Sequence, residues 1–339
     1  MAKGRAQGER LWKMKIREKS YHIKNIINVF LKLKLSRKKQ SCKKEFLEKW
    51  YCPSKIESHS HKLKITWIGQ ATFLIQIAGI NILTDPIFFS PSIFVNRICP
   101  PGIELSQLSK IDYVLISHDH RDHLDKKSLL AIKNHQPKIL APKNACTKFF
   151  AKNFKNFCEL NWKETHTQNF CQHNRNEFTT VKTKLGEIKF TFLKANHWSG
   201  RNIIFDLNKS PCGSWMIEYN CQNNINSKTI YFAGDTAYGN HFTEIFNNFK
   251  NIDLALLPIG PIEPNHIVVN SHLNSKQAIQ SFFDLNAKQF IPMHWGTFEI
   301  GTENFDEPIN QLQYQWKLSQ EKLKNKKLII SRIGECLEL

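Results

Sequence analysis

Several features are missing from this sequence of 339 residues, and each absence excludes a class of protein. The nine cysteines are odd in number and include no Cys-x-x-Cys pair, which argues against a disulfide framework and favours reduced thiols. No N-terminal stretch is long enough to cross a bilayer, because Lys32 ends the uncharged run that starts at Asn25. The same region lacks the apolar stretch and small-residue site of a cleavable signal. We therefore expect a cytoplasmic protein, which leaves a peripheral position on the inner membrane face open.

Positive charge is concentrated at the N-terminus. Residues 1–64 carry 19 Lys or Arg and 5 Glu, a balance of +14 out of the +19 of the whole chain, so the remainder contributes only +5. The charge predicts a basic arm at residues 1–60 and a hydrolase domain at residues 61–339. Two interpretations of the arm stay open. It could be a polycation that contacts anionic lipid or nucleic acid, with roughly 1 kcal/mol per basic residue near a membrane, or a solvated, partly disordered leader.

One segment of the arm has an amphipathic pattern. Its apolar residues fall on one face at helical spacing: Ile23, Ile26, Ile27, Phe30 and Leu33. Lys34 interrupts that face one turn later. The pattern predicts a short basic amphipathic helix that rests on a membrane surface.

The rest of the chain alternates between strand and helix patterns, and its 41% apolar content is enough for a full core. The expected strands are 63–68, 73–77, 80–83, 112–117, 188–193, 214–219, 229–233, 253–257, 289–293 and 327–330. The expected helices are 125–134, 144–152, 275–285 with a cap at Asn274 or Ser275, and 308–324. Two strand-rich halves are compatible with two packed sheets covered by helices.

A dense run of metal-binding side chains follows the predicted strand at 112–117. The run reads His118-Asp119-His120-Arg121-Asp122-His123. Imidazole nitrogens and a carboxylate are donors suited to zinc, and this spacing lets one turn present them to two adjacent ions. So many imidazoles and carboxylates in so few residues are hard to explain by packing, so the run predicts a metal-dependent hydrolase.

Three later donors occupy the same kind of position. His197, Asp235 and His294 each come just after a predicted apolar strand. A layered sheet could bring all of these strand ends to one edge, beside the first cluster. Gly234 and Gly296 would let the backbone come close to a crowded site.

With these motifs the sequence resembles the metallo-β-lactamase superfamily, and within it the N-acylphosphatidylethanolamine-hydrolysing phospholipase D group. The resemblance runs from about Ile65 to the C-terminus. Its motifs are Thr66-Trp67-Ile68-Gly69, Leu83-Thr84-Asp85-Pro86, the His118–Asp125 run, Asn196-His197-Trp198, Gly213-Ser214-Trp215, Gly234-Asp235-Thr236, Leu257-Pro258-Ile259-Gly260, Glu263-Pro264 and His294-Trp295-Gly296-Thr297.

The resemblance implies an α/β fold, the four-layer αββα sandwich, with two Zn²⁺ ions per chain at one edge. It implies that His118, His120 and His197 hold one ion, that Asp122, His123 and His294 hold the other, and that Asp235 bridges them. The implied reaction is cleavage of an N-acylphosphatidylethanolamine-like lipid to phosphatidic acid and an N-acylethanolamine by a metal-bridging hydroxide. Besides Asp122, His272 is an implied catalytic residue, since it matches a histidine that contacts substrate or protonates the leaving group.

Two departures from the group concern the substrate. Arg121 stands where the lipid-cleaving relatives carry a tyrosine, and Gln70 replaces a histidine after Gly69. Arg121 is a candidate for substrate binding because its planar guanidinium suits phosphate oxygens. The loop at 87–101 is apolar and could admit acyl chains or cover the sheet, and we favour core packing.

Three function classes therefore stay in play. The leading class is a phospholipase D acting on a phospholipid or another phosphodiester. The second is a lactonase, nuclease or other phosphoester hydrolase acting on a soluble substrate. The third is a non-enzymatic binding protein that uses the arm, against which the complete ligand set argues. Without evident stacking platforms, no specific nucleic-acid recognition is expected.

Overall fold

The computed structural model describes residues 42–162, 178–183, 185–202, 205–221 and 226–339, together with Ser20 and Lys24. Apart from Lys24, the expected amphipathic helix around residues 23–33 lies outside the described residues. None of the described helices combines the length and apolar character needed to cross a membrane. The seven cysteine side chains that the structure describes are all free thiols.

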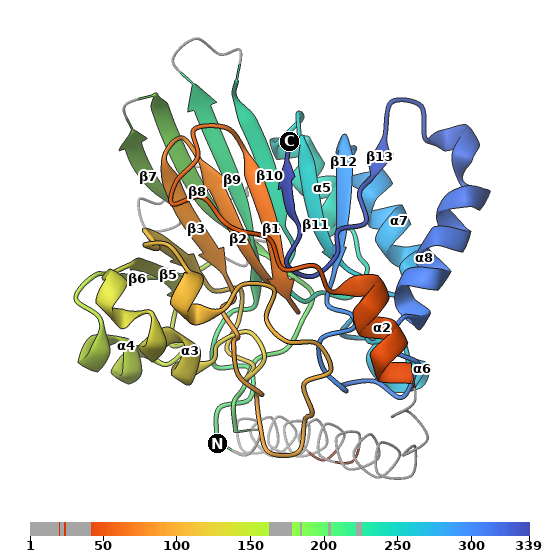
Figure 1. Ribbon diagram of the computed structural model, residues 1–339, viewed down its shortest axis with the longest axis horizontal. Coiled ribbons are helices and arrows are strands. Elements are labelled where there is room, and N and C mark those ends of the chain that lie inside the picture. Colours follow the sequence, from red (N-terminus) through yellow and green to blue (C-terminus); the bar gives the residue numbers. More distant parts are fainter. Residues whose placement is uncertain are drawn as a thin grey trace, which may run out of the picture.

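Two sheets of seven strands form the centre of the molecule (Figure 1). The first sheet has the order β14-β1-β2-β3-β4-β5-β6. Its strands are β1 (Lys64–Gly69), β2 (Thr72–Ile77), β3 (Ile80–Thr84), β4 (Tyr113–Leu115), β5 (Lys138–Pro142), β6 (Phe157–Leu160) and β14 (Cys336–Glu338). The first three strands of the chain form an antiparallel meander, because β1, β2 and β3 pair antiparallel in sequence order.

The second sheet has the order β13-β12-β11-β10-β9-β8-β7. Its strands are β7 (Phe178–Thr183), β8 (Gly186–Lys194), β9 (Gly213–Cys221), β10 (Lys228–Phe232), β11 (Leu254–Pro258), β12 (Gln289–Met293) and β13 (Lys327–Leu328). Since β8 and β10 both pair antiparallel with β9, they run in the same direction. β11 and β12 continue that direction in parallel. The carboxyl ends of β8, β10 and β12 therefore meet at one edge.

The core divides into layers that follow the alternation of side chains along each strand. In β2, Phe73 and Ile75 face the second sheet and join Phe190 and Trp215 in one large cluster. Leu74, between them, belongs to a separate cluster on the other face. That second cluster also holds Leu129 of α3 (Lys126–Ala131) and Phe150 of α4 (Thr147–Asn153), which cover the outer face of the first sheet.

Helices also cover the second sheet, which completes the expected αββα sandwich. They are α5 (His241–Asn248), α7 (Ser275–Asp284) and α8 (Glu307–Leu318). The short helix α6 (Asn265–Val268) precedes α7 and has no buried residues. Phe282 of α7 stacks on Phe290 of β12 with ring centroids 5.6 Å apart. The predicted cap of α7 is confirmed at Asn274, which forms a capping box with Gln277.

Helix α2 (Cys42–Trp50) packs onto the sandwich although it lies on the N-terminal side of residue 60. Phe46 and Trp50 are buried, and both contact the ring of Trp295 edge-on, with centroid distances of 6.1 and 4.9 Å. The charge boundary at residue 60 stays a prediction for the arm before residue 42, which the structure does not describe.

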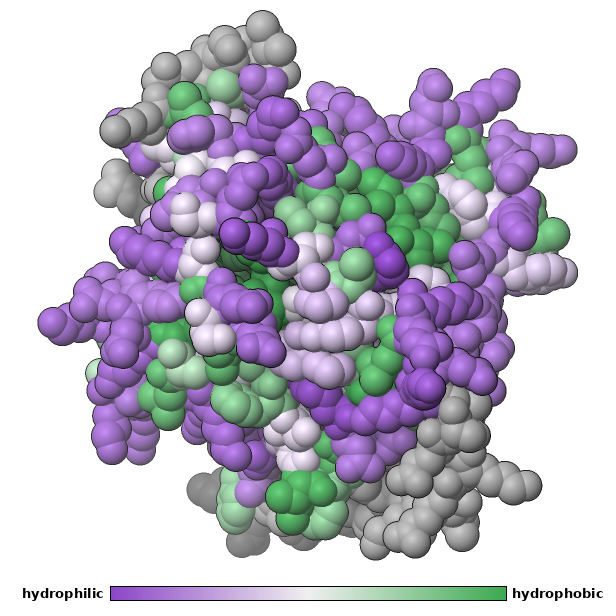
Figure 2. All heavy atoms as spheres, viewed as in Figure 1, coloured by the Kyte–Doolittle hydropathy of each residue, from purple (hydrophilic) through white to green (hydrophobic). Residues whose placement is uncertain are grey.

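Two further expectations differ from the structure. Helix α8 ends at Leu318 rather than residue 324, because the N–H of Ser319 donates to the carbonyl of Trp316, three residues back, and the chain continues as a separate 3-10 turn at Gln320–Lys322. The loop at 87–101 is only partly core: Phe88 and Ile98 are buried, whereas Ile93 is 90% and Phe94 66% exposed. Figure 2 shows a mainly hydrophilic surface, with hydrophobic side chains gathered in several places, among them an area above and to the right of the centre and a smaller one at the lower edge.

Candidate metal centre

The residues at 118–123 form one tight turn between β4 and α3. The backbone N–H groups of His123 and Leu124 both donate to the carbonyl of His120, at 3.1 and 2.8 Å. Asp125 ends the turn by capping α3, since its carboxylate accepts from the N–H groups of Lys127 and Ser128. A strand end and a helix cap thus fix the turn on both sides.

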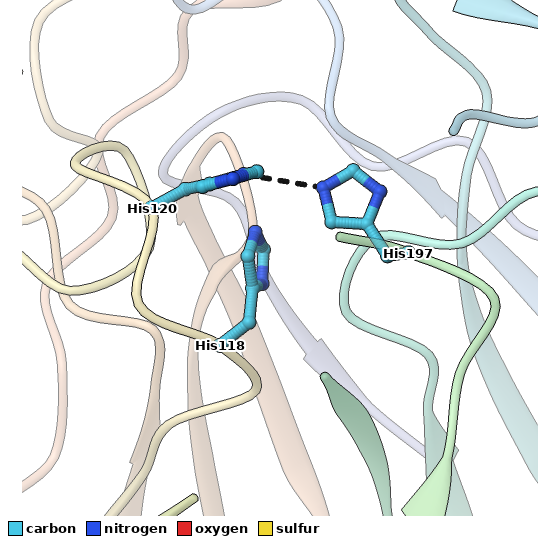
Figure 3. Close-up of side chains that lie close together, drawn as sticks. All are labelled: His118, His120 and His197. Atoms are coloured by element: carbon cyan, nitrogen blue, oxygen red, sulfur yellow. Dashed lines mark hydrogen bonds between the residues drawn. The ribbon is translucent and has the colours of Figure 1, made fainter. Parts of the chain in front are cut away.

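Three imidazoles converge into a first group. His118 and His120 come from the turn, and His197 comes from the loop after β8. Nε2 of His197 lies 3.2 Å from Nδ1 of His120, and the ligand atoms of the three residues all lie within 4.8 Å of one another (Figure 3). This spacing suits one tetrahedral ion with an open fourth position.

A second group contains Asp122, His123, Asp235 and His294. Nε2 of His123 and Nε2 of His294 lie 3.2 Å apart, and each is 3.5 Å from Oδ2 of Asp122. The structure therefore brings together all seven predicted metal ligands, from loops that follow β4, β8, β10 and β12.

The carboxylate of Asp235 lies between the two groups. Its Oδ1 is 3.1 Å from Nε2 of His294, and its Oδ2 is 3.2 Å from Nε2 of His123. The same Oδ2 lies 3.8 Å from Nε2 of His197 and 4.0 Å from Nε2 of His118. Asp235 is thus within reach of both ligand groups, and its bridging role stays a prediction.

The donor set fits metal ions. Among the described residues, Nε2 of His118 and Nε2 of His120 are buried and have no hydrogen-bond partner. A buried polar atom without a partner costs free energy, unless a metal ion takes its lone pair. Nitrogen and carboxylate donors favour zinc or a similar transition metal over magnesium or calcium.

The protonation states of the first group also suit metal binding. Burial lowers the pKa of His118 and of His120 well below the usual range, and the neighbouring imidazoles add to the effect. Burial likewise lowers the pKa of His197. These rings are therefore neutral near pH 7, which is the form that binds metals.

The second group pairs two carboxylates with two histidines. Burial opposes charge on every member, but the contacts between them outweigh burial. They hold the pKa of Asp122 and of Asp235 well below the usual carboxyl range. They raise the pKa of His294 to about 9 and that of His123 well above the usual range. In the ion-free protein, protons on the histidines balance the carboxylates, so metal binding should release protons.

Each of three ligand histidines is held from behind through its other ring nitrogen. Nδ1 of His123 lies 2.7 Å from Oδ2 of Asp85, Nδ1 of His197 lies 2.8 Å from the carbonyl of Ser271, and Nδ1 of His118 lies 2.9 Å from the hydroxyl of Ser117. Such partners fix the ring orientation and keep Nε2 directed into the centre.

Asp85 and Gln70 are site residues whose roles the sequence reasoning missed. Asp85 is fully buried and also accepts from the N–H and hydroxyl of Ser117, so it joins the loop after β3 to the ligand turn. Gln70 donates to Asp122 and contacts His294. Asp85 lies in the Leu83-Thr84-Asp85-Pro86 motif of the family resemblance, and Gln70 is a departure from the phospholipase D group. Neither fact alone predicted a contact with a metal ligand.

The two predicted substrate residues occupy different positions. Nδ1 of His272 lies 3.7 Å from Oδ2 of Asp235, and its ring is within 5.5 Å of the rings of His197 and His294. Burial lowers the pKa of His272 to about 3. Arg121 is exposed, beside the ligand turn. His272 thus faces the centre, whereas Arg121 lies at its rim.

Comparisons with known proteins agree with this geometry. A family model for the beta-lactamase superfamily domain matches residues 80–295, which is more than half of the chain and includes all seven ligand positions. An uncharacterized protein of Mycobacterium tuberculosis is 30% identical over 271 residues, which cover 77% of this chain and 66% of that protein. The chain therefore spans slightly less than two thirds of this relative.

Two further similarities concern a named activity and a solved fold. The N-acyl-phosphatidylethanolamine-hydrolyzing phospholipase D 1 of Caenorhabditis elegans is 29% identical over 287 residues, covering 80% of this chain and 75% of that enzyme. The metallo hydrolase Igni18 of Ignicoccus hospitalis superposes with a TM-score of 0.58 at 20% identity, covering 82% of this chain and 98% of the other. With its αββα layers and its convergent histidines and aspartates, the chain belongs to the metallo-β-lactamase superfamily.

Proposed function

We propose that the protein is a zinc-dependent phosphodiester hydrolase of the phospholipase D type. It cleaves N-acylphosphatidylethanolamine-like lipids at the bond between phosphorus and the ethanolamine oxygen. The hydroxyl of a water molecule goes to phosphorus and gives phosphatidic acid, and the proton goes to the leaving oxygen and gives an N-acylethanolamine. The observation that carries the proposal is the two-part ligand set around Asp235, in a chain that aligns over most of its length with a named phospholipase D.

His118, His120 and His197 would hold one zinc ion, and Asp122, His123 and His294 the other, with Asp235 shared between them. Bound zinc would lower the pKa of water to about 7 and neutralise charge that develops on the phosphoryl oxygens. The protein's own contribution is to fix these side chains. Asp85, Ser271 and Ser117 hold three of the ligand rings from behind, so little reorganisation is needed during the reaction.

His272 and Arg121 supply the contacts to substrate in this proposal. His272 faces Asp235 from the loop between α6 and α7, where it contacts the phosphate or protonates the leaving oxygen. Arg121, at the rim, offers its guanidinium to the phosphate oxygens. A phosphodiester suits both residues, because it places an anionic group beside the Arg121 cation and its oxygens within reach of a ring N–H of His272.

Replacing His272 by alanine is expected to lower kcat by about 10²–10⁴-fold, the usual contribution of a positioned acid or base. The variant should still bind both ions, because His272 is not among the seven proposed ligands. Steady-state kinetics together with a metal count checks this expectation. His266→Ala is the control, since His266 is an exposed histidine on nearby α6. Unchanged kinetics in the His272 variant would rule out the role.

The substrate class is tested by product analysis on a panel of phospholipids with purified, zinc-loaded protein. Release of phosphatidic acid and an N-acylethanolamine supports the proposal. Turnover of a lactone, a nucleic acid or a soluble phosphoester without lipid cleavage would move the assignment to a different hydrolase on the same fold. If the purified protein bound no metal ion, both assignments would be wrong.

A further inference from the structure

We propose that Gln70 is a positioning residue for the second ligand group, where its side-chain amide holds Asp122 and His294 in ligating positions before an ion binds. The inference rests on the proposed dinuclear centre. It adds a residue outside the seven ligands and the two substrate contacts. It also gives a role to the glutamine that departs from the phospholipase D group after Gly69.

The backbone of Gln70 is fixed on every side. The residue follows β1 in a left-handed conformation with φ of 53°, and it is 1% exposed. Its N–H donates to Oγ1 of Thr297 at 2.7 Å. Its carbonyl accepts from the N–H of His294 and from the indole of Trp67, both at 3.0 Å. The turn after β1 is therefore joined directly to the loop that carries His294.

The side chain of Gln70 points from this fixed backbone into the second ligand group. Its Nε2 lies 2.9 Å from Oδ2 of Asp122 and 2.8 Å from Nε2 of His294. An ionised carboxylate only accepts hydrogen bonds, so the nitrogen of the amide must face Asp122. The same nitrogen also lies against Nε2 of His294, so the amide touches both ligating atoms.

The two atoms that Gln70 contacts are those through which Asp122 and His294 would ligate an ion. Both are electron-pair donors toward an ion. In the ion-free protein the N–H of the amide keeps the carboxylate of Asp122 turned inward. The Gln70 carbonyl, which accepts from the backbone N–H of His294, holds the loop that carries this ligand. When an ion takes the lone pair of His294, the hydrogen bond to Asp122 remains and orients that carboxylate.

An amide suits this task because it is neutral at every physiological pH. It adds no charge to a group that already pairs two carboxylates with two histidines. It is also a weak metal ligand compared with imidazole and carboxylate, so it yields to the ion. A carboxylate at the same position would repel Asp122, and an apolar side chain would leave Asp122 without this donor.

The test compares Gln70→Met with Gln76→Met in the full-length protein. Methionine keeps the approximate volume of glutamine and removes both N–H donors. Gln76 is the matched control, since it is an amide buried to the same degree in β2, whose nitrogen contacts Glu57 and Asn81 away from the centre. Ion-depleted protein is titrated with Zn²⁺ in competition with a chelator. The two binding steps are assigned with His197→Ala, which removes a ligand of the first group.

In Gln70→Met we expect binding at the second group to weaken by about 10–100-fold, the usual effect of losing a partner of a metal ligand. The first step should stay unchanged, and Gln76→Met should titrate like the unsubstituted protein. Should Gln70→Met fail to fold, Gln70→Asn replaces it, because the shorter amide withdraws from both ligating atoms. Unchanged or tighter binding at the second group would overturn the inference while leaving the metal centre intact. No zinc uptake by the unsubstituted protein would instead overturn the dinuclear centre itself.

Discussion

Asp235→Ala should cause the largest loss of any single substitution, because both ligand groups share this carboxylate. The change leaves Nε2 of His123 and Nε2 of His294, 3.2 Å apart, without the anion that lies between them. Removing one partner of a buried charged pair costs roughly 3–5 kcal/mol, which corresponds to about 10²–10⁴-fold in an equilibrium constant. We expect ion affinity and kcat/KM each to fall by at least the lower of these factors.

Metal analysis of the dialysed variant and steady-state kinetics measure the two effects separately. Asp284→Ala is the matched control. In the described part of the chain, the carboxylate of Asp284 accepts hydrogen bonds from Tyr238 and Gln280 at the surface of α7. Asp235→Asn keeps the shape of the side chain and removes its charge, so it shows how much of the loss is electrostatic. Two tightly held ions in Asp235→Ala would contradict the shared-ligand arrangement.

Removing the metal ions is expected to abolish turnover and to lower the melting temperature. A ligand at 100 times its dissociation constant stabilises the folded state by about 2.7 kcal/mol. One kcal/mol shifts the melting temperature of a large domain by roughly 2–4 °C, so dialysis against a chelator should lower it by about 5–10 °C. The effect follows from geometry, because an ion in the first group would satisfy the buried Nε2 of His118, which has no hydrogen-bond partner.

Differential scanning calorimetry before and after chelation, with zinc added back, checks this prediction. Recovery of both activity and melting temperature is the expected result. Activity that survives exhaustive chelation, with no metal left in the sample, would exclude the proposed chemistry. A melting temperature that rises on chelation would show that the ions strain the centre instead of stabilising it.

Much of the fold was predictable because strong local patterns decide it. The runs at 73–77 and 289–293 are apolar and strand-like, and they form β2 and β12 within one residue of the expected bounds. Some short elements were missed. α5 places Phe242 and Ile245 on one face but over only eight residues, and β5 is a five-residue run that ends in proline. Their structure depends on neighbours that only the folded chain supplies.

The candidate site follows the same division. The His118–His123 run could be identified because a dinuclear metal site needs an unusual density of histidine. His197, Asp235 and His294 could be identified because each follows a predicted strand. Asp85 could not be assigned in this way, since one aspartate after a strand is common at turns. Its role depends on its 2.7 Å contact with His123, which lies 38 residues away. The role of Gln70 could not be predicted from the sequence either, because its neighbouring residues do not indicate that its amide faces Asp122.

The packing of α2 changes where this enzyme can be divided. Phe46 comes so close to Gly296 that a Cβ on that glycine would lie 2.4 Å from its ring, and Trp50 abuts Trp295, the residue after a proposed ligand. Charge separates the chain near residue 60, but packing does not. A protein shortened to its weakly charged part would lose two aromatic supports of the His294 loop along with the lysines. The basic segment and the sandwich therefore cannot be separated at residue 60, and any truncation or fusion must keep α2 with the sandwich.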